Sequence, residues 1–269
     1  MNYHDIFVIS DLDGTLLGND KTIPKRNLEA IARFQSKGGR FAIATGRSVI
    51  TGAPYIDAVS PNGPSVILNG TIIYDSAERK ILWNLPLNTE KTKRYVEIIH
   101  ERFPGTGIEV YSTDSLGVLK DNPYVSSHLE RANMERCVPD IFNGRTLCKV
   151  IFMDDADVIQ ELAAFTETFE HEDVRFVLSS ENFLEMLPAK ADKGSALKKI
   201  ISSCGFPMEN VYAIGDYYND LELLQAAGFA AMPQNSPDEL KEEYADLVVC
   251  DCSEGAVADL IEYIERKAE

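Results

Sequence analysis

The sequence predicts an α/β protein that has a parallel-sheet core and a smaller α+β domain inserted into it. Three observations support this. The apolar runs 6–10 and 40–44 do not alternate with polar residues and are separated by a helical pattern, which is typical of strands buried on both faces of a parallel sheet. The same rhythm returns after residue 191. Between these regions, the adjacent strand-like runs 174–179 and 182–187 indicate an antiparallel or mixed sheet.

The N-terminal part of the core reads as alternating strands and helices. Pro24 lies near the first turn of one helix and Gly38 follows its end, which are the usual positions of these residues at helix boundaries. The expected elements are a strand at 6–10, a helix at 24–37, a strand at 40–44, a helix reaching about residue 58 and a third parallel strand at 65–69.

The pattern changes near residue 85, so we predict a discontinuous core, residues 1–84 and 189–269, with an inserted domain over 85–188. In the insertion we expect helices at 89–103, 122–136 and 155–170 and strands at 107–112, 116–119, 147–153, 174–179 and 182–187. In the second part of the core we expect helices at 192–204, 219–227, 236–244 and 255–266 and strands at 210–214, 229–232 and 246–249.

Composition narrows the class of protein. The 269 residues carry a net charge of -17, which argues against nucleic acid or an anionic membrane as a partner but leaves phosphorylated small molecules open. Apolar content of 45% is sufficient for a large core, and no apolar stretch reaches the roughly 18 residues that span a bilayer. The start of the chain does not resemble a signal peptide. We therefore expect a cytoplasmic protein, monomeric or weakly dimeric.

The five cysteines are an odd number in a long chain, so a disulfide scaffold is not expected. Cys250 and Cys252 are spaced like a pair of soft-metal ligands. No second pair of cysteine or histidine residues flanks them, which is not the pattern of a structural zinc site.

Two carboxylates follow the first buried strand, in VISDLDGTLL. Asp11 and Asp13 are two residues apart, so their side chains are expected to face the same space beyond the carboxyl end of the strand. Two like charges about 4 Å apart repel by roughly 4 kcal/mol at an effective dielectric near 20, which a bound cation or a shared proton relieves. A calcium loop is excluded because Leu16 and Thr22 occupy the positions of its glycine and glutamate. A simple turn remains the alternative.

AIGDYYND repeats this design after another strand, with Asp216 and Asp220 at its carboxyl end. On its own it is compatible with a turn in which Asn219 or Asp220 caps the next helix. Several acids meeting at one edge of a sheet favour a divalent cation, and hard oxygen ligands favour Mg²⁺.

Two further stretches suit an anionic ligand. In AIATGRS, Thr45 and Gly46 end a buried strand and open a helix, where a hydroxyl and backbone N–H groups form a small oxyanion site. In PAKADKGSAL, Asp192 is placed to cap a helix whose first turn carries Lys193, a position that the helix dipole disfavours for a cation. A solvated surface lysine is the alternative for Lys193, and Lys190 is a competitor for its role.

These four stretches, in this order, resemble the four motifs of the haloacid dehalogenase (HAD) superfamily of phosphohydrolases. The position of the insertion between the second and third motifs is similar to the Cof-type phosphatases, which have a large α/β cap. The segments LNGTIIYD, AAMPQNSPDELK and SEGAVADLIE resemble further parts of that family, so the likeness covers most of the core. The resemblance implies a Rossmann-like, HAD-like core and a cap that closes over the active site.

The resemblance also implies a reaction: hydrolysis of small phosphorylated metabolites, such as sugar phosphates, through an aspartyl-phosphate intermediate. Asp11 is implied as the nucleophile and Asp13 as the general acid and base. The implied ligands of Mg²⁺ are Asp11, Asp13 through its backbone carbonyl, Asp216 and, directly or indirectly, Asp220. The implied phosphate-binding residues are Thr45, Gly46, Lys193 and Asn219, with Arg47 reaching the substrate or the phosphate.

Three other functions remain open. A phosphomutase would pass the phosphoryl group between two hydroxyls of a sugar phosphate by using the same aspartate. A non-catalytic sensor of phosphorylated metabolites is disfavoured because a binder needs no nucleophile. A purely structural protein would leave the four motifs without an explanation.

Overall fold

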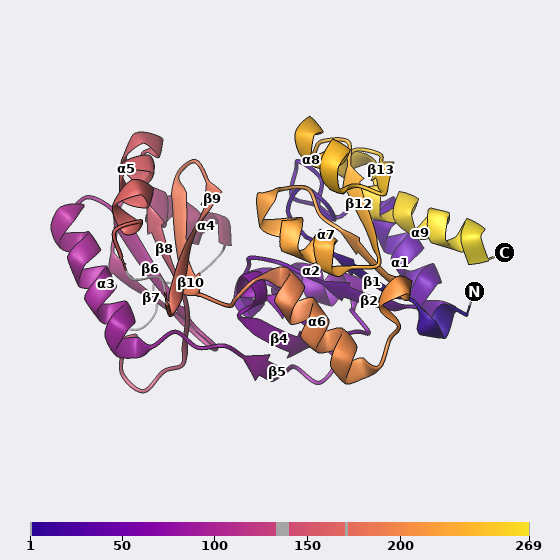
Figure 1. Cartoon of the computed structure of the whole chain (residues 1–269), viewed down its shortest axis with the longest axis horizontal. Coiled ribbons are helices and arrows are strands. Elements are labelled where there is room, and N and C mark those ends of the chain that lie inside the picture. Colours follow the sequence, from indigo (N-terminus) through magenta and orange to yellow (C-terminus); the bar gives the residue numbers. More distant parts are fainter. Residues whose placement is uncertain (1, 133–139, 170–171, 269) are drawn as a thin grey trace. The chain divides into compact units, whose positions relative to one another are not determined.

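The computed structural model describes residues 2–132, 140–169 and 172–268 (Figure 1). The chain divides into two compact units. Unit 1 consists of Met1–Arg47, Gly52–Trp83 and Asp192–Glu269, and unit 2 consists of Ser48–Thr51 and Asn84–Ala191. The roles of core and cap that the sequence suggests for such a division stay a prediction.

Unit 1 is built on a parallel sheet whose strands lie in the order β13-β12-β11-β1-β2 (Figure 1). Each neighbouring pair in that order is parallel. The predicted α/β class is therefore confirmed. The strands are β1 (Phe7–Ser10), β2 (Arg40–Ile43), β11 (Val211–Ile214), β12 (Phe229–Pro233) and β13 (Leu247–Val249).

Apolar side chains fix β1 in the middle of this sheet. All of its residues are fully buried. Phe7 and Ile9 share a core cluster with residues of α6 and α7, such as Leu197 and Leu223. Because side chains alternate along a strand, Val8 points to the opposite face. On that side α1 contacts β2 and packs against α9. These helices are α1 (Lys25–Ser36), α6 (Lys193–Cys204), α7 (Leu221–Ala226) and α9 (Ala256–Ala268). Two further helices are α2 (Val49–Val59) and α8 (Asp238–Tyr244).

The expected third parallel strand at 65–69 is only partly right. β3 (Ser65–Ile67) touches the parallel sheet through a single bridge between Ala44 and Val66. Its main partner is antiparallel β4 (Ile72–Asp75), and β5 (Lys80–Asn84) extends this second sheet. The chain reverses at Leu68 and Asn69, both in the left-handed region, and β4 and β5 were not predicted from the sequence.

Unit 2 contains an antiparallel sheet in the order β7-β6-β8-β10-β9. This confirms that the adjacent strand-like runs form antiparallel pairs. Apolar residues of α3 and α5 pack on one face of it, where Ile99 and Ile159 join Phe152 in a common core. The elements are α3 (Thr89–Arg102), β6 (Gly107–Ser112), β7 (Leu116–Lys120), α4 (Pro123–Ala132), β8 (Leu147–Met153), α5 (Ala156–Thr166), β9 (Val174–Ser180) and β10 (Phe183–Pro188).

Two predicted helices and one cysteine fall partly or wholly outside the described residues. The predicted helix at 155–170 corresponds to α5, and its last position lies outside them. The predicted helix at 122–136 begins as α4, and its last four positions lie beyond the part that the structure describes. Cys137 also lies outside the described residues. Within the described ranges, no helix combines the length and the apolar character needed to cross a membrane.

Asn27 fastens the loop that follows β1 to the helices of unit 1. Its fully buried side-chain amide donates to the Leu16 carbonyl at 3.0 Å, and its Oδ1 accepts from the Ala258 amide at 2.9 Å. Replacing it leaves two buried backbone groups without these partners, which costs roughly 1–3 kcal/mol for each group.

We expect Asn27→Ala to lower the free energy of unfolding by about 2–4 kcal/mol, measured by urea denaturation. Lys25→Ala on the same helix is the matched control, because Lys25 is exposed and its removal should change the stability by less than about 0.5 kcal/mol. Equal stabilities of the two variants would contradict the anchoring role of Asn27.

Candidate active site

The carboxyl ends of β1, β2 and β11 meet at one edge of the parallel sheet of unit 1. Pairing of Ser10 with Ile43 and Ile214 brings the three strand ends to the same level. The Asp11 amide continues the pairing by donating to the Ile214 carbonyl at 2.9 Å. The residues that follow each strand, Asp11 to Thr15, Thr45 to Arg47 and Gly215 to Asp220, therefore gather at this edge.

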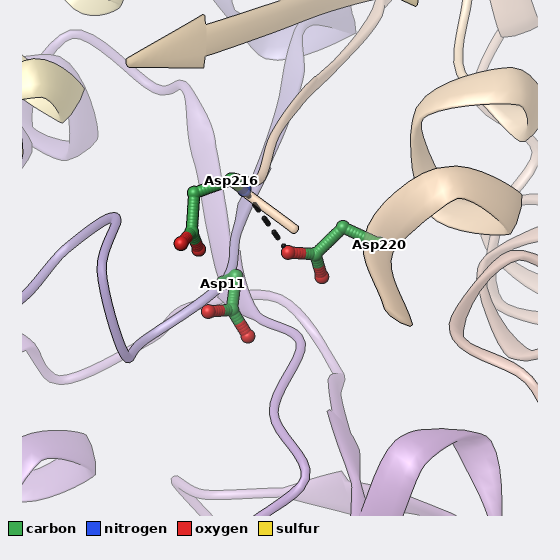
Figure 2. Close-up of side chains that lie close together, drawn as sticks. All are labelled: Asp11, Asp216 and Asp220. Carbon is green, nitrogen blue, oxygen red and sulfur yellow. Dashed lines mark hydrogen bonds between the residues drawn. The ribbon is translucent and has the colours of Figure 1, made fainter. Parts of the chain in front are cut away.

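Three acids form a buried cluster at this edge (Figure 2). One carboxylate oxygen from each of Asp11, Asp216 and Asp220 lies within 4.8 Å of the other two. Among the described residues, these acids form the one group of three or more side chains that could hold a metal ion. Its donors are all carboxylate oxygens, which are the ligands that Mg²⁺ prefers, so the residues present fit that ion.

Lys193 is the cation inside this cluster. It is the first residue of α6 and is 1% exposed, so the alternative of a surface lysine is wrong. Its Nζ donates to Asp11 Oδ1 at 2.6 Å and to Asp220 Oδ1 at 2.5 Å. Burial opposes its charge, but the two carboxylates raise the pKa of Lys193 above its ordinary value. As expected, Asp192 caps the helix by accepting from the Ser195 amide.

The backbone after β11 holds Asp220 in place. Asp220 Oδ2 accepts from the amides of Asp216 and Tyr217, at 3.1 and 3.4 Å (Figure 2). Asp220 is fully buried and stands at the N-cap position of α7, but its side chain makes no capping hydrogen bond to α7 and instead accepts from the backbone of the short turn before it. Asn219 lies half-buried on the same short turn.

Asp216 is held from the opposite side by the loop after β1. Thr15 Oγ1 donates to Asp216 Oδ1 at 2.9 Å, a link between residues 201 positions apart. Gly14 adopts a positive φ of 81°, and a Cβ at this position would overlap the Asp216 carboxylate. Glycine is therefore required here both for the backbone conformation and for the close approach of the acid.

The acid cluster favours protons or a cation. Burial and the neighbouring Asp220 carboxylate raise the pKa of Asp11 well above its ordinary value, although Lys193 partly offsets them. The same two causes raise the pKa of Asp216 to about 7. Three acids share a single lysine in this cluster, so a bound divalent cation would remove the remaining repulsion.

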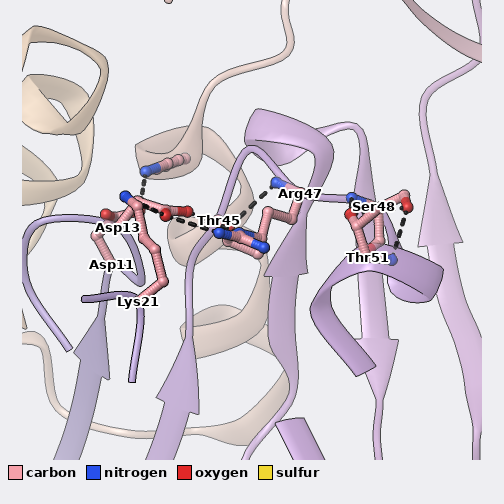
Figure 3. Close-up of polar contacts among 8 residues, drawn as sticks. Asp11, Asp13, Lys21, Thr45, Arg47, Ser48 and Thr51 are labelled. Atoms are coloured by element: carbon pink, nitrogen blue, oxygen red, sulfur yellow. Dashed lines mark hydrogen bonds and ion pairs between the residues drawn. The ribbon is translucent and has the colours of Figure 1, made fainter. Parts of the chain in front are cut away.

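Asp13 has a different environment from Asp11. Arg47 binds it with two hydrogen bonds, from Nε to Oδ2 at 2.7 Å and from Nη2 to Oδ1 at 2.8 Å, and Lys21 Nζ donates to Oδ1 at 3.0 Å (Figure 3). Burial works to raise the pKa of Asp13, but these two cations lower it to about 2. The side chains of Asp11 and Asp13 thus have separate partners, which spacing within the strand does not reveal.

The turn after β2 brings backbone and hydroxyl groups to the same edge. Thr45 is buried, and its Oγ1 accepts from the Arg47 amide at 3.1 Å. Its carbonyl accepts from the Asn69 amide at 3.0 Å. A Cβ at Gly46 would lie 3.0 Å from Asn69 Oδ1, a tight contact that would require the Asn69 side chain to shift. Ser48 and Thr51 then exchange hydrogen bonds at the start of α2 (Figure 3).

Three residues of this edge were missed by the sequence analysis. Lys21 reaches Asp13, Asn69 packs beside Gly46, and Asn235 donates to the Gly14 carbonyl at 2.8 Å. Asn69 and Asn235 belong to stretches that resemble the family, so their place in the motifs was the available signal. Lys21 offered no signal beyond its distance of eight residues from Asp13.

The cysteine pair takes no part in the acid cluster. Cys252 is fully buried, and burial raises its thiol pKa. Burial and the neighbouring Asp259 raise the thiol pKa of Cys250 to about 12. In the part of the chain that the structure describes, neither cysteine belongs to a group of three potential metal ligands, so a soft-metal pair gains no support.

Comparison with known proteins gives the family. The family model described as haloacid dehalogenase-like hydrolase matches residues 8–261. The chain is 28% identical over 262 residues to the pyridoxal phosphate phosphatase YbhA of Escherichia coli, which covers 93% of this chain and 95% of the relative. It is 29% identical over 260 residues to the 5-amino-6-(5-phospho-D-ribitylamino)uracil phosphatase YwtE of Bacillus subtilis, which covers 87% and 89%.

Solved structures agree with this result. A haloacid dehalogenase-like hydrolase of Bacteroides thetaiotaomicron matches with a TM-score of 0.87 and 26% identity, covering 96% of this chain and 99% of the other. A protein of Thermotoga maritima matches with a TM-score of 0.83 and 25% identity, covering 96% and 97%. The expected fold, Cof-type family and enzyme class are confirmed: the chain belongs to the haloacid dehalogenase-like hydrolases and is a phosphoric monoester hydrolase.

Proposed function

We propose that this chain is a Mg²⁺-dependent phosphatase that hydrolyses small phosphorylated metabolites, sugar phosphates among them, through an aspartyl-phosphate on Asp11. One observation carries the proposal. At the end of the central strand, the Asp11 carboxylate lies in a buried cluster with Asp216 and Asp220, and a fully buried lysine holds one of its oxygens. The relatives named above as phosphatases of pyridoxal phosphate and of a ribitylaminouracil phosphate support small phosphorylated substrates.

Asp11 is placed to act as the nucleophile. Lys193 occupies Oδ1, and we assign the attack on phosphorus to Oδ2. A bond forms between this oxygen and phosphorus while the bond to the leaving oxygen breaks. Water then attacks phosphorus of the aspartyl-phosphate, which releases inorganic phosphate and restores the Asp11 carboxylate.

Asp13 moves the protons in both steps. It donates a proton to the leaving oxygen in the first step and accepts one from the attacking water in the second. With Arg47 and Lys21 on its carboxylate it is ionised, which suits the second role. The first role requires a proton on Asp13, and the proton that it accepts from water in the second step is the one that it donates to the leaving oxygen of the next substrate.

Mg²⁺ would be held by Asp11, the Asp13 backbone carbonyl and Asp216, with Asp220 supporting this set through Lys193. When bound, it offsets the negative charge of the phosphate and of the nucleophile. Thr45, the Gly46 amide, Lys193 and Asn219 bind the phosphoryl oxygens, and Arg47 binds the substrate or the phosphate. We retain a cytoplasmic location as part of this proposal.

We expect Asp11→Asn to abolish phosphate release from a panel of phosphorylated metabolites measured with Mg²⁺. The amide cannot attack phosphorus, whereas the fold should persist because the substitution removes one buried charge from an acid cluster. Phosphate release and thermal unfolding are to be measured together. Undiminished turnover by Asp11→Asn would contradict the assignment of Asp11 as nucleophile. If the wild-type enzyme forms an isomeric sugar phosphate without releasing phosphate, the protein is a mutase.

We expect Mg²⁺ to raise the midpoint of thermal unfolding, because an ion that binds only the folded state at 100 times its Kd stabilises it by about 2.7 kcal/mol. Asp216→Asn removes a ligand and should abolish this rise. Asp20→Asn is the control, since Asp20 is an exposed acid whose carboxylate is engaged by Thr22. The same rise in all three proteins would place the ion elsewhere.

We expect Lys193→Met to reduce the free energy of unfolding in metal-free buffer by about 3–5 kcal/mol, because it leaves the buried carboxylates of Asp11 and Asp220 without their cation. Adding Asp220→Asn to this variant should restore part of the loss. Lys198→Met, at an exposed position of the same helix, is the control for a lost charge. Urea denaturation is the measurement, and stability equal to that of the wild type would refute the structural role of Lys193.

A further inference from the structure

We infer that Lys21 is a specificity-determining residue that favours substrates whose leaving group carries a second negative charge, such as a carboxylate or another phosphate. The inference rests on the proposed function, because it places the leaving group at Asp13. It assigns a role to a residue that belongs to none of the four motifs. Its basis is the set of contacts around the Asp13 carboxylate.

Both oxygens of Asp13 are occupied by cations. Arg47 takes Oδ2 at 2.7 Å and Oδ1 at 2.8 Å, and Lys21 takes Oδ1 at 3.0 Å (Figure 3). A residue that hands a proton to the leaving oxygen has to present an oxygen to it. Asp13 Oδ1 accepts hydrogen bonds from both Arg47 and Lys21, so release of Lys21 frees one acceptor position on Oδ1 while Arg47 keeps both of its bonds.

Lys21 is the cation that is easier to displace. Arg47 makes two parallel hydrogen bonds to Asp13, its side chain is 25% exposed, and its guanidinium lies 4.8 Å from the centre of the Tyr55 ring. Lys21 makes one hydrogen bond to Asp13, and its side chain is 59% exposed. A single contact at an exposed site is worth less than a bidentate pair stacked on an aromatic ring.

The backbone beneath Lys21 is a closed turn. The Lys21 amide donates to the Gly18 carbonyl and the Gly18 amide donates to the Thr22 carbonyl, both at 2.9 Å. Lys21 itself has a φ of 61°, which is uncommon for a residue with a side chain. Asp20 in the same turn is engaged by the Thr22 amide and hydroxyl. The Lys21 side chain can therefore change partner while its Cα keeps its position.

Charge then determines which substrates benefit. Asp13 carries one negative charge and contacts two positive ones, so a displaced Lys21 needs a new anion close to the leaving oxygen. An anionic leaving group supplies that partner. With a neutral leaving group, the displaced Lys21 ammonium moves into water and contributes no binding energy to the substrate. The difference is a preference in kcat/KM for the anionic substrate.

The test compares two pairs of substrates that keep the same phosphate position. One pair is 6-phosphogluconate and glucose 6-phosphate, and the other is glucuronic acid 1-phosphate and glucose 1-phosphate. For each pair, the ratio of kcat/KM for the anionic over the neutral leaving group is measured with Mg²⁺. We expect Lys21→Met to lower this ratio about tenfold, mainly through KM of the anionic substrate, which corresponds to about 1.4 kcal/mol.

Lys25→Met is the matched control, because Lys25 is an exposed lysine four residues further on whose partner is Glu29. It removes the same charge from the chain and should leave the ratio unchanged. Lys21→Arg keeps a cation and should retain most of the preference. A lysine that merely supported the fold would lower kcat/KM for both members of a pair together.

The outcomes separate the two proposals. If the wild-type enzyme releases phosphate and Lys21→Met keeps the wild-type ratio, the role of Lys21 is wrong and the proposed function stands. An equal fall in the Lys25→Met ratio also overturns it, because a general charge effect then explains the result. Failure of the wild-type enzyme to release phosphate from any of the four compounds contradicts the proposed function itself.

Discussion

The hydrogen bonds of one buried lysine to two buried aspartates organise the candidate site. Asp11, Asp216 and Asp220 bring three carboxylates to one point, and Lys193 neutralises the charge of only one of them. The lysine stands at the start of a helix, where the dipole disfavours it, so the carboxylates have to hold it there. The same imbalance that raises the pKa values of Asp11 and Asp216 provides the driving force for binding a divalent cation.

The two acids that follow β1 have contrasting environments. Asp11 is buried among acids, and its pKa is raised, whereas Asp13 is bound by two cations, and its pKa is lowered to about 2. Pairs of acids whose environments separate their pKa values are typical of sites that divide a reaction between two groups. Here the difference in pKa follows from the partners, because Lys193 contacts Asp11 while Arg47 and Lys21 contact Asp13, and it agrees with the roles proposed for the two acids.

Local pattern was enough to predict the parallel sheet and the place of Asp11 and Asp216, since apolar strands that end in acids need no knowledge of distant contacts. The sheet formed by β3, β4 and β5 was missed because 65–69 was interpreted as a strand of the parallel sheet, although Asn69 is followed by a glycine and such a pair between apolar runs is a known turn signal. The bond from Thr15 to Asp216 and that from Lys21 to Asp13 were missed for another reason. Both bonds depend on tertiary packing, which residue spacing along the chain does not reveal.

The position of Lys21 also explains how specificity and chemistry are kept apart in unit 1. Asp11 is fixed by the pairing of β1 with β11 and by Lys193, whereas Lys21 stands on a turn that lies outside the sheet and is closed by its own hydrogen bonds. That turn is tied to the rest of the unit by the bond from the Asn19 amide to Ser253 Oγ. A change of side chain at position 21 therefore alters the charge beside Asp13 without moving Asp11, the proposed nucleophile, so the proposed preference for a leaving group is adjustable while the acid cluster stays constant.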